Sequence, residues 1–169
     1  MEVTVTYLEM KARPVQPTTP APRADLTVMH AVTPTLSFYR YLYNTVGAAW
    51  HWVDRGKLSD EKLAAIVQDP AVEVHVLYAG GVPAGYAELD RRSPPDIELA
   101  YFGIMPEFIG QKLGPFLLGW SIEKAFSYSP RRYWLHTCTL DHPKALATYQ
   151  SAGFEIYDRK LILAGQPAH

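Results

Sequence analysis

The chain has 169 residues, of which 48% are hydrophobic and 20% are charged, a composition typical of one globular domain and not of a disordered chain. Its 16 basic and 17 acidic residues leave a net charge of −1, which excludes the basic footprint of a nucleic-acid-binding protein. No apolar run is long enough to span a membrane, and we expect no membrane partner. The N-terminus lacks the pattern of a secretory signal, and one cysteine, Cys138, excludes an internal disulfide, so we expect a reducing, cytoplasmic setting.

The N-terminal third of the chain predicts an extended segment followed by two helices. Residues 1–25 combine a weakly alternating strand at 3–10 with a Pro-rich connector, and 26–31 is a second short strand candidate. Thr33-Pro34 starts a helix that Gly47 ends, and the residues at helical spacing within it are Leu36, Tyr39, Tyr43 and Val46. Residues 47–56 form a loop or short helix. A second helix begins at Ser59 or Asp60, with Leu63, Ile66 and Val67 facing inward.

The remaining elements alternate between strands and helices. Residues 72–92 predict a hairpin because two β-rich runs flank Gly80-Gly81. After it the sequence predicts a strand at 97–104, a helix at 114–128, a strand at 132–138, a helix at 143–152 and a closing strand at 154–164. We expect Leu118, Ile122 and Ala125 on one face of the first of these helices, and Gly153 at the C-terminal cap of the second.

The loop between the strand at 97–104 and the following helix has the features of a phosphate-binding loop. The segment IGQKLGP (109–115) leads into a helix N-terminus, where backbone N–H groups and the helix dipole attract anions. Gly110 and Gly114 let the backbone approach a ligand closely, whereas Pro115 removes one N–H donor. Lys112 adds both a Cβ atom and a cation. An ordinary strand-to-helix loop that needs glycines for its geometry is the alternative.

A second segment, HPKALATYQSAGF (142–154), lies about thirty residues after this loop and forms a second motif with it. Together the two resemble the GNAT superfamily of acetyl-CoA-dependent N-acetyltransferases, whose motifs are strand–Pro–Arg/Gln-x-x-Gly-x-Gly/Ala–helix and Asn-x-x-Ala-x-x-hydrophobic-Tyr-x-x-x-Gly-Phe. The positions that fit are Pro106, Gly110, Gly114, Ala145, Tyr149, Gly153 and Phe154. Three positions depart: Ile109 replaces Arg or Gln, Lys112 replaces the middle Gly, and His142 replaces Asn. A register that begins at Gln111 puts Phe116 in the last glycine slot and breaks the spacing from Pro106, so we reject it.

The resemblance implies the fold and the cofactor. The fold would be a single α+β domain over 1–169, with a mixed, mostly antiparallel central sheet flanked by helices. The reaction would be direct transfer of acetyl from acetyl-CoA to a primary amine in a ternary complex. In the family, the strand that corresponds to 97–104 splays from the next strand, and its exposed backbone pairs with the pantetheine amides. The cofactor-binding residues would be Phe102, Gly103, Ile104, Ile109, Gly110, Gln111, Lys112, Gly114, Pro115, His142 and Ala145.

Two residues are predicted to be catalytic. Glu98 lies inside an otherwise apolar strand, where burial raises the pKa of a carboxyl towards the range of a general base, and it aligns with the glutamate base of histone-acetyltransferase-type relatives. A solvent-facing glutamate, or one paired with an arginine, is the alternative. Glu88 on the neighbouring strand is the alternate base. Tyr149 matches the family tyrosine near the cofactor sulfur and would protonate, or donate a hydrogen bond to, the departing thiolate; a packed core tyrosine is the alternative.

The acceptor pocket is expected among the aromatic residues of the first helix and the loop after it. Trp50, Trp52 and His136 are the substrate-site candidates, whereas Tyr39 and Tyr43 are expected in the core. His142 is expected to cap its helix or to contact the cofactor, and a solvated histidine near the helix N-terminus is the alternative. The spacing of His136, Cys138 and His142 does not match a standard zinc pattern, so no metal is expected.

The acceptor amine is either a small molecule or a protein, and dimerisation is common in the family, which makes a homodimer a partner to consider. One rival hypothesis keeps catalysis but changes the acyl donor or the acceptor. A second is a non-catalytic acyl-CoA-binding module with a degenerate phosphate loop, suggested by Ile109 and Lys112. A third is a surface that serves a protein partner.

Overall fold

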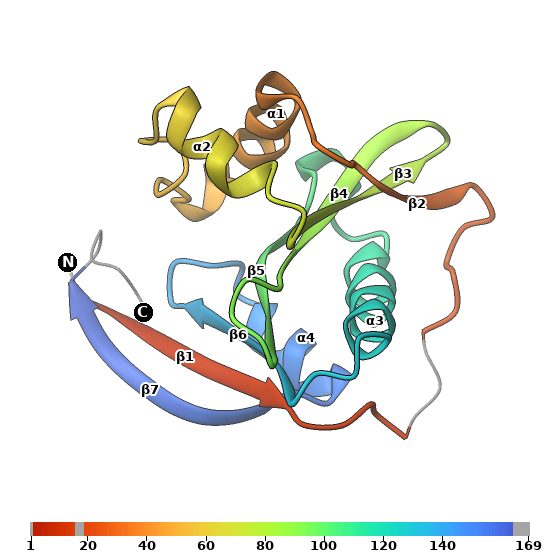
Figure 1. The fold of residues 1–169 in the computed structure, drawn as a ribbon. Coiled ribbons are helices and arrows are strands. Elements are labelled where there is room, and N and C mark those ends of the chain that lie inside the picture. Colours follow the sequence, from red (N-terminus) through yellow and green to blue (C-terminus); the bar gives the residue numbers. More distant parts are fainter. Residues whose placement is uncertain (1, 16–18, 164–169) are drawn as a thin grey trace.

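The computed structural model describes residues 2–15 and 19–163, which fold around one sheet of seven strands (Figure 1). In chain order the elements are β1 (Glu2–Met10), β2 (Leu26–His30), α1 (Leu36–Gly47), η1 (Ala48–Trp50), α2 (Asp60–Val67), β3 (Val72–Ala79), β4 (Val82–Asp90), β5 (Asp96–Ile104), η2 (Pro106–Phe108), α3 (Leu113–Phe126), β6 (Arg132–Cys138), α4 (Ala145–Ala152) and β7 (Glu155–Leu163). Among the described residues, no helix combines the length and apolarity needed to span a membrane.

The sheet has the strand order β2-β3-β4-β5-β6-β1-β7 and is antiparallel except at one place. There β5 and β6 run parallel, and their pairing covers only residues 96–98 against residues 132–134. Beyond Glu98 the two strands separate, so β5 continues to Ile104 without β6 beside it. The predicted mixed, mostly antiparallel sheet is therefore confirmed, and the strand splay implied by the family resemblance is present.

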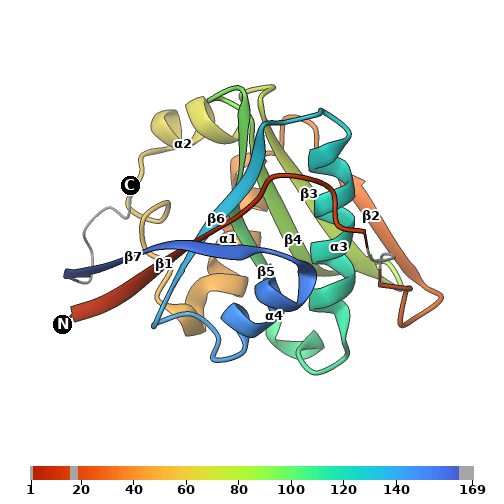
Figure 2. The same cartoon turned by 90° about the horizontal axis from the view of Figure 1, so that it is seen from below.

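Helices cover both faces of the sheet (Figure 2). Helices α1 and α2 lie on one face, where Tyr39, Tyr43 and Val46 pack with residues of β3 and β4 into one apolar cluster. Helices α3 and α4 lie on the other face, where Leu118, Ile122 and Ala125 pack into a second cluster. These six side chains are all buried, as their helical spacing predicts.

Local sequence signals explain where most elements begin and end. The Thr35 side chain accepts a hydrogen bond from the backbone N–H of Phe38, so α1 begins just after it and not at Thr33-Pro34. Ser59 caps α2 in the same way. Gly153, with φ at 112°, ends α4 in the left-handed conformation that glycine adopts without strain.

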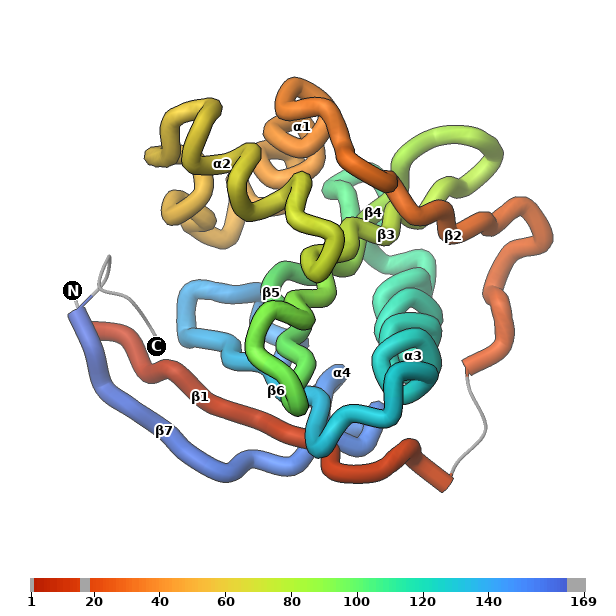
Figure 3. Tube along the Cα trace, viewed as in Figure 1, coloured from red at the N-terminus to blue at the C-terminus, as the bar shows by residue number. Residues whose placement is uncertain are grey.

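The strand β1 joins the far end of the sheet, away from its neighbours in sequence. It pairs antiparallel with β6 on one side and with β7 on the other, so that Val5 lies opposite both Cys138 and Lys160. Figure 3 shows β1 and β7 running side by side over their length. The alternation of residues 3–10 predicts this strand correctly, but not its position between two strands that lie more than a hundred residues later.

A β-bulge in β5 sets the direction of the side chains that follow it. Leu89 lies opposite Leu99 and Glu88 lies opposite Tyr101, so Ala100 is an extra residue with no partner in β4. Because side chains alternate along a strand, the extra residue brings Glu98 and Tyr101 onto the same face of the sheet. That face is the one that carries Glu88 and Asp90 on β4.

Candidate active site

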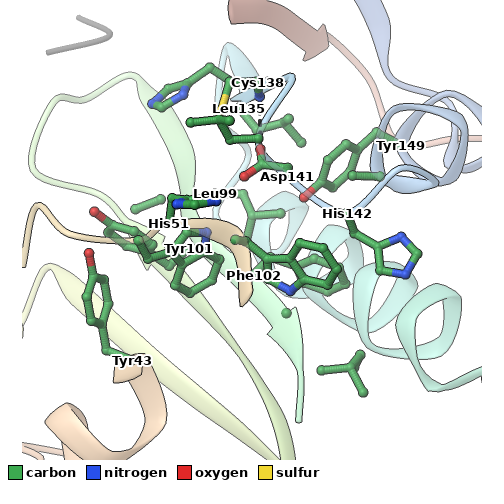
Figure 4. A pocket seen from close by; sticks show the side chains of 18 of the residues that line it. Tyr43, His51, Leu99, Tyr101, Phe102, Leu135, Cys138, Asp141, His142 and Tyr149 are labelled. Atoms are coloured by element: carbon green, nitrogen blue, oxygen red, sulfur yellow. Dashed lines mark hydrogen bonds between the residues drawn. The ribbon is translucent and has the colours of Figure 1, made fainter. Parts of the chain in front are cut away.

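A cavity of about 1120 Å³ opens where β5 and β6 separate (Figure 4). Its walls come from the segment between η1 and α2, from β5, from the start of α3, from the end of β6 and from α4. All but one of the predicted site residues line it: Trp50, Trp52, Glu98, Phe102, Gly103, Ile104, Ile109, Gly110, Lys112, Gly114, Pro115, His136, His142, Ala145 and Tyr149. The fold thus brings segments that are far apart in the sequence to one space.

Gln111 is the exception among the predicted site residues. It does not belong to the residues that line the cavity. Its side-chain oxygen accepts a hydrogen bond of 2.9 Å from Nη1 of Arg23, whose guanidinium also contacts Asp25. The Gln111 side chain therefore ties the loop to the segment before β2 instead of facing the cavity.

The loop at 109–115 fits a phosphate cradle in a way that packing does not explain. Gly114 has an ordinary negative φ, and a Cβ atom built on it would meet only Cγ1 of Ile104, at 4.0 Å. Neither backbone conformation nor a protein neighbour therefore requires glycine here, but close approach of a ligand does. Gly110 has open space in front of it, and its φ of 89° is a conformation suited to glycine. The residues present fit the diphosphate of coenzyme A.

Lys112 shows why the family prefers glycine at its position. Its φ of 64° and ψ of 22° lie in the left-handed region, which a residue with a Cβ atom adopts at an energetic cost. The Lys112 side chain lines the cavity. The departure at Lys112 therefore strains the backbone of the loop.

Glu98 has the electrostatic surroundings of a general base. Burial raises its pKa to about 7, and the nearby carboxylates of Asp90 and Glu88 add to this shift, while Arg55 and Arg92 oppose it. Its Oε2 atom lies 3.8 Å from Nε2 of His136. A carboxyl with a pKa near neutrality is poised to take a proton from an amine.

Glu88 is committed to a buried ion pair. It is fully buried, its Oε2 atom lies 2.9 Å from Nη1 of Arg55, and its Oε1 atom accepts a hydrogen bond of 2.5 Å from the Tyr39 hydroxyl. It does not line the cavity. The alternate base of the sequence analysis is therefore placed where it cannot reach an acceptor amine.

Tyr149 points from α4 towards the interior of the cavity and the Asp141 carboxylate (Figure 4). Burial raises the pKa of its hydroxyl, and Asp141 raises it further, so the hydroxyl stays protonated at neutral pH. Asp141 is itself held by Thr137 and by the backbone N–H of Cys138. The Phe102 ring lies 6.1 Å from the Tyr149 ring and links α4 to β5.

The histidine and tryptophan candidates have distinct positions. His142 accepts a hydrogen bond of 3.0 Å from the backbone N–H of Lys144 through Nδ1, which fixes the turn before α4, and its ring lies 5.0 Å from that of Trp50. Trp52 packs with Tyr101, their ring centroids 5.1 Å apart, and forms part of an aromatic wall with Tyr43. In the described part of the chain no group of His, Cys, Asp and Glu side chains could hold a metal ion.

The cavity residues that the sequence did not single out include Arg55, Tyr101 and Asp141. Arg55 belongs to a loop without periodicity, and its partner Glu88 lies 33 residues away, so no local spacing connects them. Tyr101 looks like one more aromatic residue of an apolar strand. Asp141 directly precedes the second motif, and this nearness to Tyr149 was the one signal available.

The model of the acetyltransferase (GNAT) family matches residues 33–154, which is more than half of the chain. The chain therefore belongs to the GNAT family of acetyltransferases. No curated protein matches it significantly.

Solved structures show the same fold. A GCN5-related N-acetyltransferase from Sphaerobacter thermophilus has a TM-score of 0.66 and 15% identity over 93% of this chain and 49% of its own. One from Kribbella flavida has a TM-score of 0.59 and 18% identity over 90% and 54%. The ribosomal-protein-S18-alanine N-acetyltransferase from Escherichia coli has a TM-score of 0.61 and 21% identity over 77% of both chains. This chain thus spans about half the length of the first two structures, and these identities support the fold alone.

Proposed function

We propose that the protein is an acetyl-CoA-dependent N-acetyltransferase that transfers acetyl to a primary amine by direct attack in a ternary complex. One observation carries the proposal: the Glu98 carboxyl, whose pKa is about 7, lines the same cavity as the loop at 109–115 and Tyr149. A base poised near neutrality beside an anion-binding helix N-terminus is the arrangement that acetylation of an amine needs.

Each part of the cavity has a role in this reaction. The bound cofactor supplies the acetyl group as a thioester. Residues 109–115 and the first turn of α3 would hold its phosphates, and the backbone of Phe102, Gly103 and Ile104, where β6 has separated, would hold its amides. Glu98 takes the proton from the acceptor ammonium. The Tyr149 hydroxyl, protonated at neutral pH, donates to the departing sulfur.

The test is release of free CoA from acetyl-CoA in the presence of a panel of amines, with longer acyl-CoA donors alongside. We expect Glu98→Gln and Tyr149→Phe each to lower kcat by about 100-fold or more, the usual size of an acid–base contribution. Glu61→Gln and Tyr41→Phe, which change exposed residues outside the cavity, are the matched controls.

The wild-type kcat/KM is expected to rise with pH through about 7, and this rise is expected to vanish in Glu98→Gln. Unchanged turnover in both cavity variants would contradict the assigned roles.

The alternative is an acyl-CoA-binding module without turnover. The exposed Ile109 and the strained Lys112 at the phosphate loop favour it. Calorimetry with acetyl-CoA, CoA and ADP separates the two: saturable binding without release of CoA for any amine supports the module.

A further inference from the structure

Arg55 is a buried arginine held in the wall of the cavity. Its Nη1 atom lies 2.9 Å from Oε2 of Glu88 and donates a 3.0 Å hydrogen bond to the Tyr39 hydroxyl. Its guanidinium carbon lies 4.9 Å from the centroid of the Tyr101 ring, and its backbone N–H donates to the Tyr43 hydroxyl at 3.1 Å. These contacts come from α1, β4 and β5, so the guanidinium is fixed before any ligand arrives.

Most of the hydrogen-bonding capacity of Arg55 is nevertheless unused by the protein. A guanidinium carries five N–H donors, three of them on Nε and Nη2. Within the described part of the chain, every hydrogen bond and ion pair of this side chain runs through Nη1. The buried atoms that lack a partner there do not include Nε or Nη2. Arg55 lines the cavity, so a ligand bound there lies beside a guanidinium with donors to spare.

The register of β4 and β5 places Arg55 near Glu98. Arg55 contacts Glu88 of β4, which lies opposite Tyr101 of β5. Glu98 of β5 lies opposite Asp90, which is two residues after Glu88 in β4. Two residues of a strand span about 7 Å. Both pairs face the same side of the sheet because of the bulge at Ala100, so one small molecule can contact Glu98 and Arg55 together.

We propose that the acceptor is an amino acid, whose amine is presented to Glu98 and whose carboxylate is bound by Nε and Nη2 of Arg55. The proposal rests on the N-acetyltransferase function proposed above. The amine nitrogen and carboxylate oxygens of an α-amino acid lie about 3 Å apart, and a hydrogen bond of about 2.9 Å at each end extends the reach to more than 7 Å. The planar fork of N–H donors on a guanidinium matches the two oxygens of a carboxylate. An acceptor amine without a carboxylate cannot use these donors in this way.

The neighbouring charges agree with this assignment. Arg92 is paired with Asp90 through contacts of 2.8 to 3.2 Å, so its charge is already balanced. Asp54, next to Arg55 in sequence, is exposed and forms no ion pair with it in the described part of the chain. The charge of Arg55 is balanced by Glu88, but its directional donors are not, so it selects by hydrogen bonding more than by net attraction.

The test compares acceptors that differ only in the carboxylate. CoA release is measured with each of the twenty common amino acids, with its carboxamide, and with a short peptide that has a free N-terminal amine. We expect the preferred amino acid to have a kcat/KM at least 30-fold above that of its carboxamide. In Arg55→Lys, which keeps a cation beside Glu88 but loses the fork, we expect this preference to fall at least tenfold through KM, with little change in kcat.

Controls separate recognition from stability. Arg40→Lys changes an arginine that is also in an ion pair, with Asp60, but outside the cavity, and is expected to keep the full preference. The double variant Arg55→Met/Glu88→Gln removes both charges, so that neither is left buried alone, and should also lose the preference. A wild type that acetylates carboxamides, amines without a carboxylate, or the peptide as well as amino acids would overturn the inference and leave the proposed function standing. If no amine releases CoA, the proposed function fails, and the inference fails with it.

Discussion

The Glu98 carboxyl combines burial with a proposed role as a base that requires ionisation, and these two properties oppose each other. Folding raises its pKa from 4.5 to about 7, so the native state binds this proton more tightly than the unfolded chain does. Stability therefore falls as the pH rises from about 4.5 to about 7 and stays lower above that range. The ionised carboxylate that the proposed base needs exists at neutral pH only because the rest of the fold tolerates this loss of stability.

Glu98→Gln is accordingly expected to stabilise the protein at pH 8. The glutamine keeps the shape but removes the charge, and a shift from 4.5 to about 7 corresponds to about 3 kcal/mol. At pH 5, where the native glutamate is protonated, we expect little difference between variant and wild type. Thermal and urea unfolding at both pH values measure this, with the exposed Glu61→Gln as control. An equal effect at pH 5 and pH 8 would show that packing, and not ionisation, is responsible.

At the residue scale, the sequence identifies groups that stand out from a local pattern. Glu98 was found because it interrupts an apolar strand, and Gly114 because it belongs to a loop with a recognisable spacing. Arg55 could not be found in this way, because its significance depends on contacts with Glu88 and Tyr101 that only the folded chain creates. The direction of the Gln111 side chain was likewise decided by a distant partner, Arg23.

At the scale of elements, the start of α3 is shaped by one unfavourable residue. Replacing Lys112 by glycine removes the left-handed strain and is expected to stabilise the fold by about 1 kcal/mol, even after the entropy that glycine loses on folding. The same change at Lys62, inside α2, is expected to cost about 1 kcal/mol, because there glycine only weakens a helix. Thermal unfolding without cofactor compares the two, and a loss at both positions would contradict this account.

Element boundaries were predictable where chemistry is local. The hairpin of β3 and β4 follows from Gly80-Gly81, both of which have positive φ, and the end of α4 follows from Gly153. The bulge at Ala100 was not predictable, because alternation within β5 is masked by residues that are apolar on both faces. The start of α1 was placed too early because Thr33-Pro34 and the true cap, Thr35, carry similar signals.

At the scale of the whole molecule, the cavity exists because two parallel strands part after three residue pairs. The family resemblance implied this parting, and no pattern within either strand encodes it. The strand β1 completes the sheet beyond β6, and Val3 and Val5 from it form part of the cavity wall. The N-terminal segment, for which sequence suggested no role, thus helps to enclose the site.

The position of β1 also has a consequence for the order in which the chain folds. Both partners of β1 lie at the other end of the sequence, Glu2 being paired with Leu163, and β7 has β1 as its neighbour in the sheet. The pairing of β1 therefore has to bring together strands that are far apart in the sequence, and such long-range pairing slows folding. A permuted chain that joins residue 163 to residue 2 by a short linker, and opens between Pro20 and Ala21, turns β7 and β1 into a local hairpin. We expect it to refold faster than the wild type in stopped-flow experiments, with the same cofactor affinity; an equal or slower rate would mean that this pairing does not limit folding.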